Sequence, residues 1–396
     1  MKKLFRISTV PVSLNILLKG QLKYLDEYFD VTAISGKGAD LEEVAQRENV
    51  KTYALEMQRQ ISPVKDVISL IKLYLYFKKE KPDIIHSITP KAGLLSMIAG
   101  KLAGVPIRIH TFTGLVFPYK KGMMQKILIL MDKLLCICAT NIYPEGRGVK
   151  NDLIEYGITQ KPLKILGNGN INGIDLDYFN PDLYSEKDSL SIREKLNIGQ
   201  NDFVFLFVGR LVGDKGINEL VKAFSELPRS SNQNIHRNIL LLVGPYEDDL
   251  DPLLPGTIIE IENNPNIISV GFQKDVRPYF AISDVFVFPS YREGFPNVLL
   301  QAGAMGKFSI VTDINGSNEI IENQINGTII PVRNEIALKL EMMNAIELLK
   351  KNQDLKNICR MRIKNMFEQS IIWEVLKNEY KNHVGNNSVS YTHLTL

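Results

Sequence analysis

The chain has 396 residues, of which 45% are hydrophobic and 23% charged, so it suits two globular domains and excludes a disordered or fibrous protein. Its formal net charge is +3, and its three cysteines (Cys136, Cys138, Cys359) have the spacing of neither a disulfide framework nor a zinc site. No apolar run reaches the roughly 20 residues that a membrane-spanning helix needs, which predicts a soluble or peripheral protein.

Short apolar runs alternate with longer amphipathic segments along the first part of the chain, a pattern that predicts βαβ units and a parallel sheet. The expected strands are Leu4–Thr9, Val31–Ser35, Asp83–Ser87, Ile107–Thr111, Asn141–Tyr143 and Leu163–Leu166. The expected helices between them include Val64–Lys79, Ala92–Leu102 and Met123–Leu135.

A polar stretch, Asp175–Ser191, is interpreted as a linker, and a second βαβ series follows it. Its expected strands are Phe203–Val208, Ile239–Val243, Ile267–Val270, Val285–Phe288, Phe308–Thr312 and Gly327–Pro331, with a helical tail from Glu335 to about His383. We expect one Rossmann-like domain over residues 1–175 and a second over residues 190–370. A C-terminal helix at about 371–384 is expected to pack back on the first domain, and residues 385–396, where the pattern breaks, are expected to be a non-native tail.

Charge is unevenly distributed along the chain. Residues 1–165 hold 25 Lys and Arg against 15 Asp and Glu, a net charge of +10, and the remainder has a net charge of −7. A basic first half indicates an anionic partner, such as lipid headgroups, a lipid-linked diphosphate or nucleic acid, or else merely solvated faces.

A glycine-rich segment follows the expected strand Phe203–Val208. It reads Gly209-Arg210-Leu211-Val212-Gly213-Asp214-Lys215-Gly216, and a helix is expected from about Ile217. Glycines allow close backbone approach, Arg210 offers a fork of donors for phosphate, and Lys215 adds a point charge beside a helix N-terminus. The spacing is neither the Walker pattern nor G-x-G-x-x-G, so the segment predicts a diphosphate site of another kind.

A second segment leaves the expected strand Val285–Phe288 and continues as Pro289-Ser290-Tyr291-Arg292-Glu293-Gly294-Phe295-Pro296-Asn297-Val298, with Gln301 one turn later. Pro296 is expected at the first helical position. Exposed N–H groups at residues 294–298 can accept an anion, while the Glu293 carboxylate can bind sugar hydroxyls, so the segment suits a sugar joined to a phosphate.

Together these segments resemble the donor site of family 4 retaining glycosyltransferases, and the resemblance extends over most of the chain. It includes Asn172-Gly173-Ile174-Asp175, Gly244-Pro245 and Asn318-Glu319-Ile320-Ile321. Within the family, Arg108 to Phe117 favours transferases of capsule, O-antigen or exopolysaccharide assembly. The resemblance implies a GT-B fold, in which two Rossmann-like domains face each other across a central cleft.

The resemblance also implies roles for single residues. Arg210 and Lys215 would hold the donor diphosphate, and Glu293 would hold the transferred hexose. The expected donor-binding set is Gly209, Gly294, Phe295, Pro296, Asn297, Val298, Gln301 and Glu319. Gln301 stands where the family has a second Glu that binds ribose, and it keeps an acceptor oxygen for that task.

In the first domain, His110 is expected either to contact the sugar or acceptor, and so to belong to the catalytic set, or to be a satisfied histidine at a strand end. The Asp-x-Asp pairs Asp175–Asp177 and Asp249–Asp251 do not lie at the end of a buried strand, so no metal site and no cofactor are expected.

The expected reaction moves a hexosyl group, with N-acetylhexosamines favoured, from a nucleoside diphosphate sugar, most simply UDP-linked, with retention of anomeric configuration. The expected acceptor is a polyprenyl-diphosphate-linked saccharide at the inner face of the bacterial cell membrane, with no nucleic acid involved. Lys120-Lys121 before the apolar helix, and Lys78 to Lys81, are expected to meet anionic lipid, although an ordinary helix with a basic cap explains them nearly as well. The alternatives are a GT-B UDP-sugar epimerase, a two-domain dehydrogenase and a non-catalytic sugar-nucleotide-binding subunit.

Overall fold

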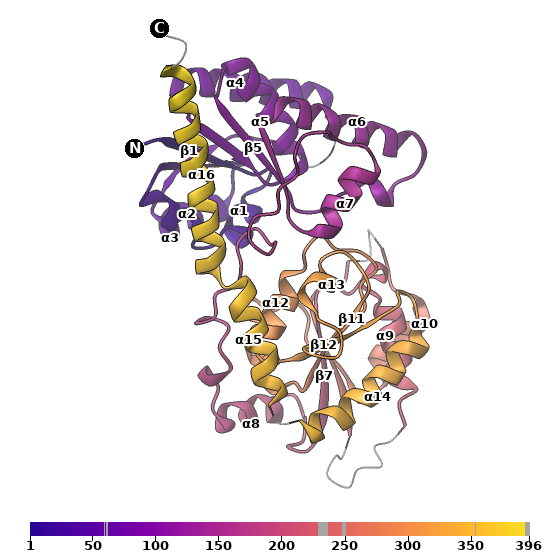
Figure 1. Ribbon diagram of the computed structural model, residues 1–396. Coiled ribbons are helices and arrows are strands. Elements are labelled where there is room, and N and C mark those ends of the chain that lie inside the picture. Colours follow the sequence, from indigo (N-terminus) through magenta and orange to yellow (C-terminus); the bar gives the residue numbers. More distant parts are fainter. Residues whose placement is uncertain (59, 61, 229–236, 248–250, 353, 393–396) are drawn as a thin grey trace. The chain divides into compact units, whose positions relative to one another are not determined.

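A computed structural model describes the chain except residues 59, 61, 229–236, 248–250, 353 and 393–396. The chain divides into two compact units. Unit 1 contains Met1–Gly173 and the residues from Gln369 on, and unit 2 contains Ile174–Glu368. Each unit is a six-stranded parallel sheet with helices on both faces (Figure 1), which confirms the α/β class expected from the alternating pattern.

The sheet of unit 1 has the strand order β3-β2-β1-β4-β5-β6. Its strands are β1 (Lys3–Ile7), β2 (Asp30–Ser35), β3 (Lys51–Ala54), β4 (Ile84–Ser87), β5 (Ile107–Phe112) and β6 (Asn141–Pro144). Its helices are α1 (Pro11–Leu17), α2 (Gln21–Asp26), α3 (Ala39–Glu48), α4 (Pro63–Glu80), α5 (Pro90–Ala103), η1 (Phe117–Tyr119), α6 (Gly122–Cys138), α7 (Arg147–Glu155) and α16 (Gln369–Thr392).

Two hydrophobic clusters cover the two faces of this sheet. Helices α4, α5 and α6 pack on one face, where Leu73, Phe77 and Leu135 meet Phe5 and Ile85. Helices α1, α2, α3 and α16 pack on the other face. The C-terminal helix α16 is therefore part of unit 1. The indole N–H of Trp373 in this helix donates to the side-chain oxygen of Asn172 at 2.7 Å.

The sheet of unit 2 has the strand order β12-β11-β10-β7-β8-β9. Its strands are β7 (Phe203–Val208), β8 (Asn238–Val243), β9 (Ile267–Ser269), β10 (Val285–Phe288), β11 (Phe308–Thr312) and β12 (Gly327–Ile330). Its helices are η2 (Pro181–Leu183), α8 (Glu186–Lys195), η3 (Gly213–Lys215), α9 (Ile217–Ser225), α10 (Pro255–Asn263), α11 (Arg277–Ile282), α12 (Asn297–Ala304), α13 (Ser317–Ile320), α14 (Glu335–Lys351) and α15 (Leu355–Phe367). All six residues of β7 are buried, as its unbroken apolar run predicts.

In both sheets the chain first builds outward on one side, then returns to the middle and builds outward on the other. This places a topological switch point between β1 and β4 in unit 1 and between β7 and β10 in unit 2. Ligands of such sheets bind outside the carboxyl ends of the strands at the switch point. The loops after β7 and β10 are therefore the first place to look for a site in unit 2.

Several local predictions are wrong. Leu163–Leu166 forms only an isolated bridge, between Leu163 and Ile142, because Pro162 before it cannot donate to a ladder. The edge strand β3 was not predicted, since its short sequence, Lys51–Ala54, leaves every residue at least partly exposed. The expected linker contains the start of α8, where Ser185 and Asp188 form a capping box. The expected helical tail is present and consists of the three helices α14, α15 and α16.

Candidate donor site

The carboxyl edge of the unit 2 sheet holds most of the residues that the sequence singles out. Arg210 follows β7, Lys215 lies in η3, Glu293 follows β10, and Glu319 lies in α13 after β11. Because β11, β10 and β7 are neighbours in the sheet, their following loops meet at one edge. Arg210, Lys215 and Glu293 therefore lie beside the switch point between β7 and β10, and Glu319 follows the neighbouring strand β11.

Two glycines make the close approach of these loops possible. Gly216 has φ +70°, and a Cβ there would lie 2.2 Å from the carbonyl oxygen of Pro289. Gly244 follows β8, and a Cβ there would lie 1.8 Å from the carbonyl oxygen of Gly209. A side chain at either position would push the loop after β7 away from its neighbour.

Lys215 and Glu293 form an ion pair across the switch point. Both side chains are mostly buried, at 14% and 19% exposure, and Ser290 donates to the same Glu293 oxygen at 3.2 Å. The Lys215 ammonium also lies 5.7 Å from the centroid of the Phe288 ring. A cation and a carboxylate are thus held side by side, which suits a phosphate next to a sugar hydroxyl.

A second ion pair crosses the same gap one residue earlier. Arg292 contacts a single Asp214 oxygen through Nε at 2.9 Å and Nη2 at 2.6 Å. The backbone N–H of Tyr291 donates to the Asp214 carbonyl at 2.8 Å, and the Asp214 N–H donates to the Asp251 carboxylate at 2.5 Å. Asp214 and Arg292 thus tie the two loops that carry Lys215 and Glu293.

Arg210 lies on the β8 side of the site. Its Nη1 donates to the Glu247 carboxylate at 2.6 Å, and both side chains are partly exposed. The Arg210 side chain is 41% exposed, so an incoming diphosphate can reach it. Glu247, Asp214 and Arg292 were not singled out from the sequence. The sequence did contain a signal for Asp214 and Arg292. Asp214-Lys215 and Arg292-Glu293 are charged pairs of opposite order, and they follow β7 and β10, which are neighbours in the sheet.

The segment after Glu293 forms a tight turn into α12. Pro296 is the N-cap and helix α12 begins at Asn297, so the prediction that Pro296 occupies the first helical position is wrong by one residue. Phe295 and Pro296 are buried, whereas Gly294, Asn297, Val298 and Gln301 are partly exposed. Gly316, which precedes α13, packs against this turn, because a Cβ there would lie 2.6 Å from the Gly294 carbonyl oxygen. This contact brings the α13 helix with Glu319, itself 8% exposed, next to the turn.

His110 lies in unit 1 on β5 and is not brought to an open surface. It is 1% exposed, its Nδ1 lies 2.8 Å from Ser87 Oγ, and its ring packs edge-on against Phe112. Burial lowers the pKa of His110 to about 3, so the imidazole is neutral. These contacts favour the satisfied-histidine interpretation and give the catalytic one no support.

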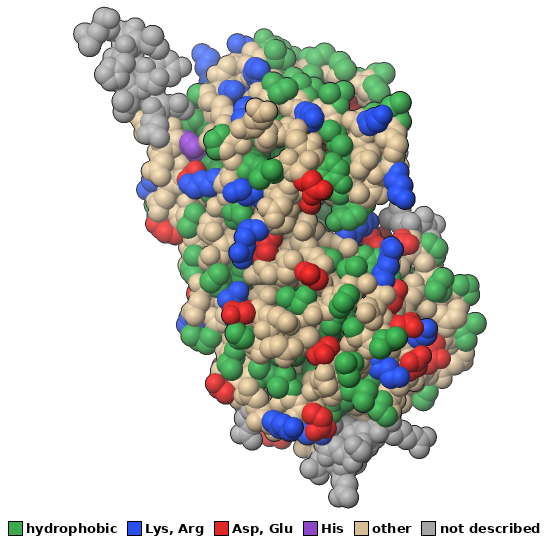
Figure 2. Space-filling view, turned by 45° about the vertical axis from the view of Figure 1, so that its right-hand side comes forward, with side chains coloured by type: hydrophobic (Ala, Val, Ile, Leu, Met, Phe, Trp, Pro, Cys, Tyr) green, Lys and Arg blue, Asp and Glu red, His purple; other side chains and the backbone are tan. Residues whose placement is uncertain are grey.

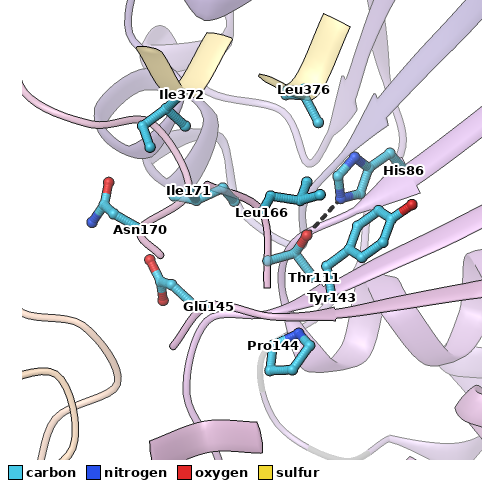
Figure 3. Close-up of a pocket in the computed structure, with 10 residues that line it drawn as sticks. All are labelled: His86, Thr111, Tyr143, Pro144, Glu145, Leu166, Asn170, Ile171, Ile372 and Leu376. Carbon is cyan, nitrogen blue, oxygen red and sulfur yellow. Dashed lines mark hydrogen bonds between the residues drawn. The ribbon is translucent and has the colours of Figure 1, made fainter. Parts of the chain in front are cut away.

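The strands of unit 1 carry a second buried histidine, which the sequence did not mark. His86 on β4 lies 2.9 Å from Arg6 Nη1, 2.5 Å from the Tyr380 hydroxyl of α16 and 2.7 Å from Thr111 Oγ1. Burial and the Arg6 cation hold the pKa of His86 well below its ordinary value. His86 and Thr111 border a cavity of about 20 Å³ (Figure 3), which has room for about one water molecule and not for a sugar.

Asp175, the first of the expected Asp-x-Asp residues, accepts from the backbone N–H groups of Asp177 and Tyr178 at 3.0 and 2.9 Å. The Asp175 carboxylate therefore stabilises a turn. In the second pair, Asp249 lies outside the described residues, and Asp251 supports the Asp214 loop as stated above.

Comparison with known proteins defines the class. Residues 188–362 match the family described as glycosyl transferases group 1, and residues 10–144 match the family described as glycosyl transferase 4-like. With two doubly wound sheets and this site, the chain is a glycosyltransferase of the GT-B fold.

Full-length relatives define the family more closely. The chain is 33% identical over 384 residues to the capsular polysaccharide biosynthesis glycosyltransferase CapM of Staphylococcus aureus, covering 96% of this chain and 97% of that protein. It is 31% identical over 346 residues to UDP-Gal:alpha-D-GlcNAc-diphosphoundecaprenol alpha-1,3-galactosyltransferase of Escherichia coli, covering 86% of each. The chain belongs to family 4 of the glycosyltransferases, as the sequence resemblance predicted.

Solved structures share the fold across nearly the whole chain. A glycosyltransferase from Rickettsia africae has a TM-score of 0.80 at 21% identity and covers 97% of this chain and 99% of its own. HepE of Anabaena, in complex with UDP and glucose, has a TM-score of 0.80 at 17% identity and covers 96% and 100%. Among the described residues, no helix combines the length and hydrophobicity needed to cross a bilayer.

Proposed function

We propose that this glycosyltransferase moves a hexosyl group from a UDP-linked sugar to a polyprenyl-diphosphate-linked saccharide during assembly of a bacterial surface polysaccharide. The observation that carries the proposal is the Lys215–Glu293 pair at the switch point, with Arg210 accessible on the same loop as Lys215. The Escherichia coli relative acts, by its name, on a diphosphoundecaprenol acceptor, and HepE of Anabaena binds UDP, which supports both halves of the proposal. N-acetylhexosamines are the favoured transferred sugars, and the enzyme acts at the inner face of the cell membrane.

The proposed chemistry follows from where the charges lie. As the bond between the anomeric carbon and the donor phosphate breaks, negative charge gathers on the leaving diphosphate. Arg210 and Lys215 lower the barrier by stabilising that charge, and Glu293 orients the hexose by accepting from its hydroxyl groups. In the same-face mechanism that the family implies, the acceptor oxygen bonds to the anomeric carbon and its proton passes to the departing phosphate. The anomeric configuration is thereby retained with neither a metal nor an enzymatic general base.

A transfer assay tests this proposal. UDP-linked hexoses and N-acetylhexosamines are incubated with a polyprenyl-diphosphate-linked monosaccharide, and the anomeric configuration of the product is determined by NMR. We expect transfer with retention, and we expect Glu293→Gln to lower kcat by about a hundredfold or more while UDP still binds. Inversion, or full activity of Glu293→Gln, would contradict the proposed chemistry.

Gln301 favours one alternative, a non-catalytic subunit that binds the sugar nucleotide, because the family's second Glu is replaced there. Complementation of a deletion strain separates the two functions. A folded Glu293→Ala protein that restores the polysaccharide fully would support the non-catalytic role. Loss of the polysaccharide with Glu293→Ala and not with Gln301→Ala would support the transferase.

A further inference from the structure

Two helices of unit 1, α4 and α6, expose apolar stripes, and each of them packs against α5. On α4 the stripe consists of Val64, Val67, Ile68, Ile71 and Leu75, and on α6 it consists of Met123, Met124, Ile127, Leu130, Leu134 and Ile137. These side chains are between 40% and 73% exposed and follow the i, i+4, i+7 spacing of one helix face. Eleven large apolar side chains on two helices exceed the scattered exposure that is normal for a soluble surface.

The two stripes belong to one side of unit 1. Helices α4 and α6 both pack against α5, which has eight of its 14 residues buried, and all three lie on the same face of the sheet. The buried faces of α4 and α6 supply Leu73, Phe77 and Leu135 to the core, so their exposed stripes lie away from it. Figure 2 turns the edge that carries α6 toward the viewer, where hydrophobic and basic side chains of unit 1 are interspersed.

Lysines flank the stripes on both helices. They are Lys65, Lys72, Lys78 and Lys79 on α4, and Lys120, Lys121, Lys126 and Lys133 on or beside α6. All are exposed except Lys133, which is partly exposed. Two copies in contact through these stripes would bring sixteen lysines together, eight from each copy. Like-charge repulsion therefore disfavours self-association through this face.

The carboxylates of the same two helices do not offset this charge. Asp66 pairs with Lys91 at 2.8 Å, and Glu80 pairs with Lys3 at 3.1 Å. Burial raises the pKa of Asp132 on α6 to about 7, so this carboxyl is partly protonated at neutral pH. The face is therefore apolar and cationic together, the combination that binds the interface of an anionic bilayer.

We infer that the exposed faces of α4 and α6 form a docking surface for a membrane containing anionic phospholipids. The apolar stripes enter the headgroup layer, and the flanking lysines contact lipid phosphates. This inference rests on the proposed function, because docking on the membrane would bring a lipid-linked acceptor within reach of unit 1.

Cosedimentation of the full-length protein with vesicles tests the inference. We expect binding to vesicles of phosphatidylcholine with 30% phosphatidylglycerol, on the order of ten times tighter than to pure phosphatidylcholine, and release as salt rises. Ile71→Ser with Leu130→Ser should weaken binding at least about tenfold. Lys72→Gln with Lys126→Gln should weaken it about 25-fold, from about fivefold per lysine.

Matched controls lie in unit 2. Ile259→Ser with Leu340→Ser removes two apolar residues of similar exposure, and Lys364→Gln removes an exposed lysine; neither should change vesicle binding. Wild-type affinity in the α4 and α6 variants, or equal binding to neutral vesicles, would overturn the inference. So would a dimer in solution that the Ile71→Ser with Leu130→Ser protein no longer forms.

UDP binding, measured on the same proteins, separates this inference from the proposed function. A wild-type protein that binds UDP and transfers sugar to a detergent-dispersed acceptor, but does not bind anionic vesicles, would refute the docking surface and leave the transferase intact. Vesicle binding without any transfer would refute the proposed function and leave the docking surface intact.

Discussion

At the scale of single residues, the site consists of two adjacent ion pairs whose charges are in opposite order. Lys215 contacts Glu293 and Asp214 contacts Arg292, so consecutive residues of one loop meet consecutive residues of the next. The inner pair has the chemistry expected for phosphate and sugar. The outer pair joins the loops after β7 and β10, and so fixes the distance between the Lys215 ammonium and the Glu293 carboxylate. Arg292 is therefore a positioning residue.

Replacing Arg292 tests this role. We expect Arg292→Ala to lower kcat about ten- to a hundredfold, because the reacting groups are misplaced, while the Kd of UDP changes less than about threefold. Arg292→Lys keeps one charged contact and should recover part of kcat. Lys339→Ala, which breaks a surface ion pair with Glu226 elsewhere in unit 2, is the control. A kcat for Arg292→Ala equal to that of the control would contradict the positioning role.

The sequence predicted residues whose roles depend on local pattern. Arg210, Lys215 and Glu293 follow buried strands and lie beside glycines, so their meeting at one sheet edge could be predicted without coordinates. The contact of Arg210 with Glu247 could not be predicted, because it depends on which loops become neighbours. The burial of His110 could not be predicted either, because it depends on the contact with Ser87 and on the packing of α5 against β5.

At the scale of elements, α6 contains a titrating group that the fold does not pair with a cation. Burial raises the pKa of Asp132 to about 7 from the ordinary value of 3.8. The unfolded chain therefore ionises at lower pH than the folded one. Below pH about 4 the carboxyl is protonated in both states and costs nothing. Between about pH 4 and pH 7 the unfolded chain is ionised while the folded chain keeps the proton, so the cost grows over this range and levels off above pH 7.

Asp132→Asn should therefore raise the free energy of unfolding at pH 8 by on the order of 1 kcal/mol, with the gain disappearing toward pH 4. Urea denaturation of both proteins at several pH values measures this difference. An equal difference at all pH values would show that the effect comes from packing and not from the charge of Asp132.

Elements with strong periodicity were predicted well, and those set by tertiary context were not. The apolar run of β7 and the amphipathic pattern of α5 give the right type and nearly the right bounds. The edge strand β3 has no buried face to impose a pattern. Next to Leu163, Pro162 has no backbone N–H to donate to a ladder. Helix α8 was hidden in a polar stretch, although its Ser185–Asp188 capping box is visible in the sequence.

At the scale of the whole molecule, the two units differ in net charge and, in our proposal, in the substrate that each one binds. The basic unit 1 exposes the apolar and cationic faces of α4 and α6, whereas unit 2 holds the candidate donor site at its switch point. The doubly wound pattern and the family resemblance together predicted this fold. The resemblance, not the physical pattern, named the reaction, because many chemistries use Rossmann-like sheets.

The most direct measurement is a thermal-shift and calorimetry panel of UDP-, GDP-, ADP- and dTDP-sugars against wild type and Arg210→Ala. Arg362→Ala, which removes another arginine paired with a carboxylate in unit 2, serves as the control. At a ligand concentration of about 100 times Kd, binding to the folded state stabilises it by about 2.7 kcal/mol. We predict a shift from UDP-sugars that Arg210→Ala abolishes and Arg362→Ala retains. A shift that persists in Arg210→Ala would contradict the placement of the diphosphate, and no shift from any sugar nucleotide would contradict the donor site itself.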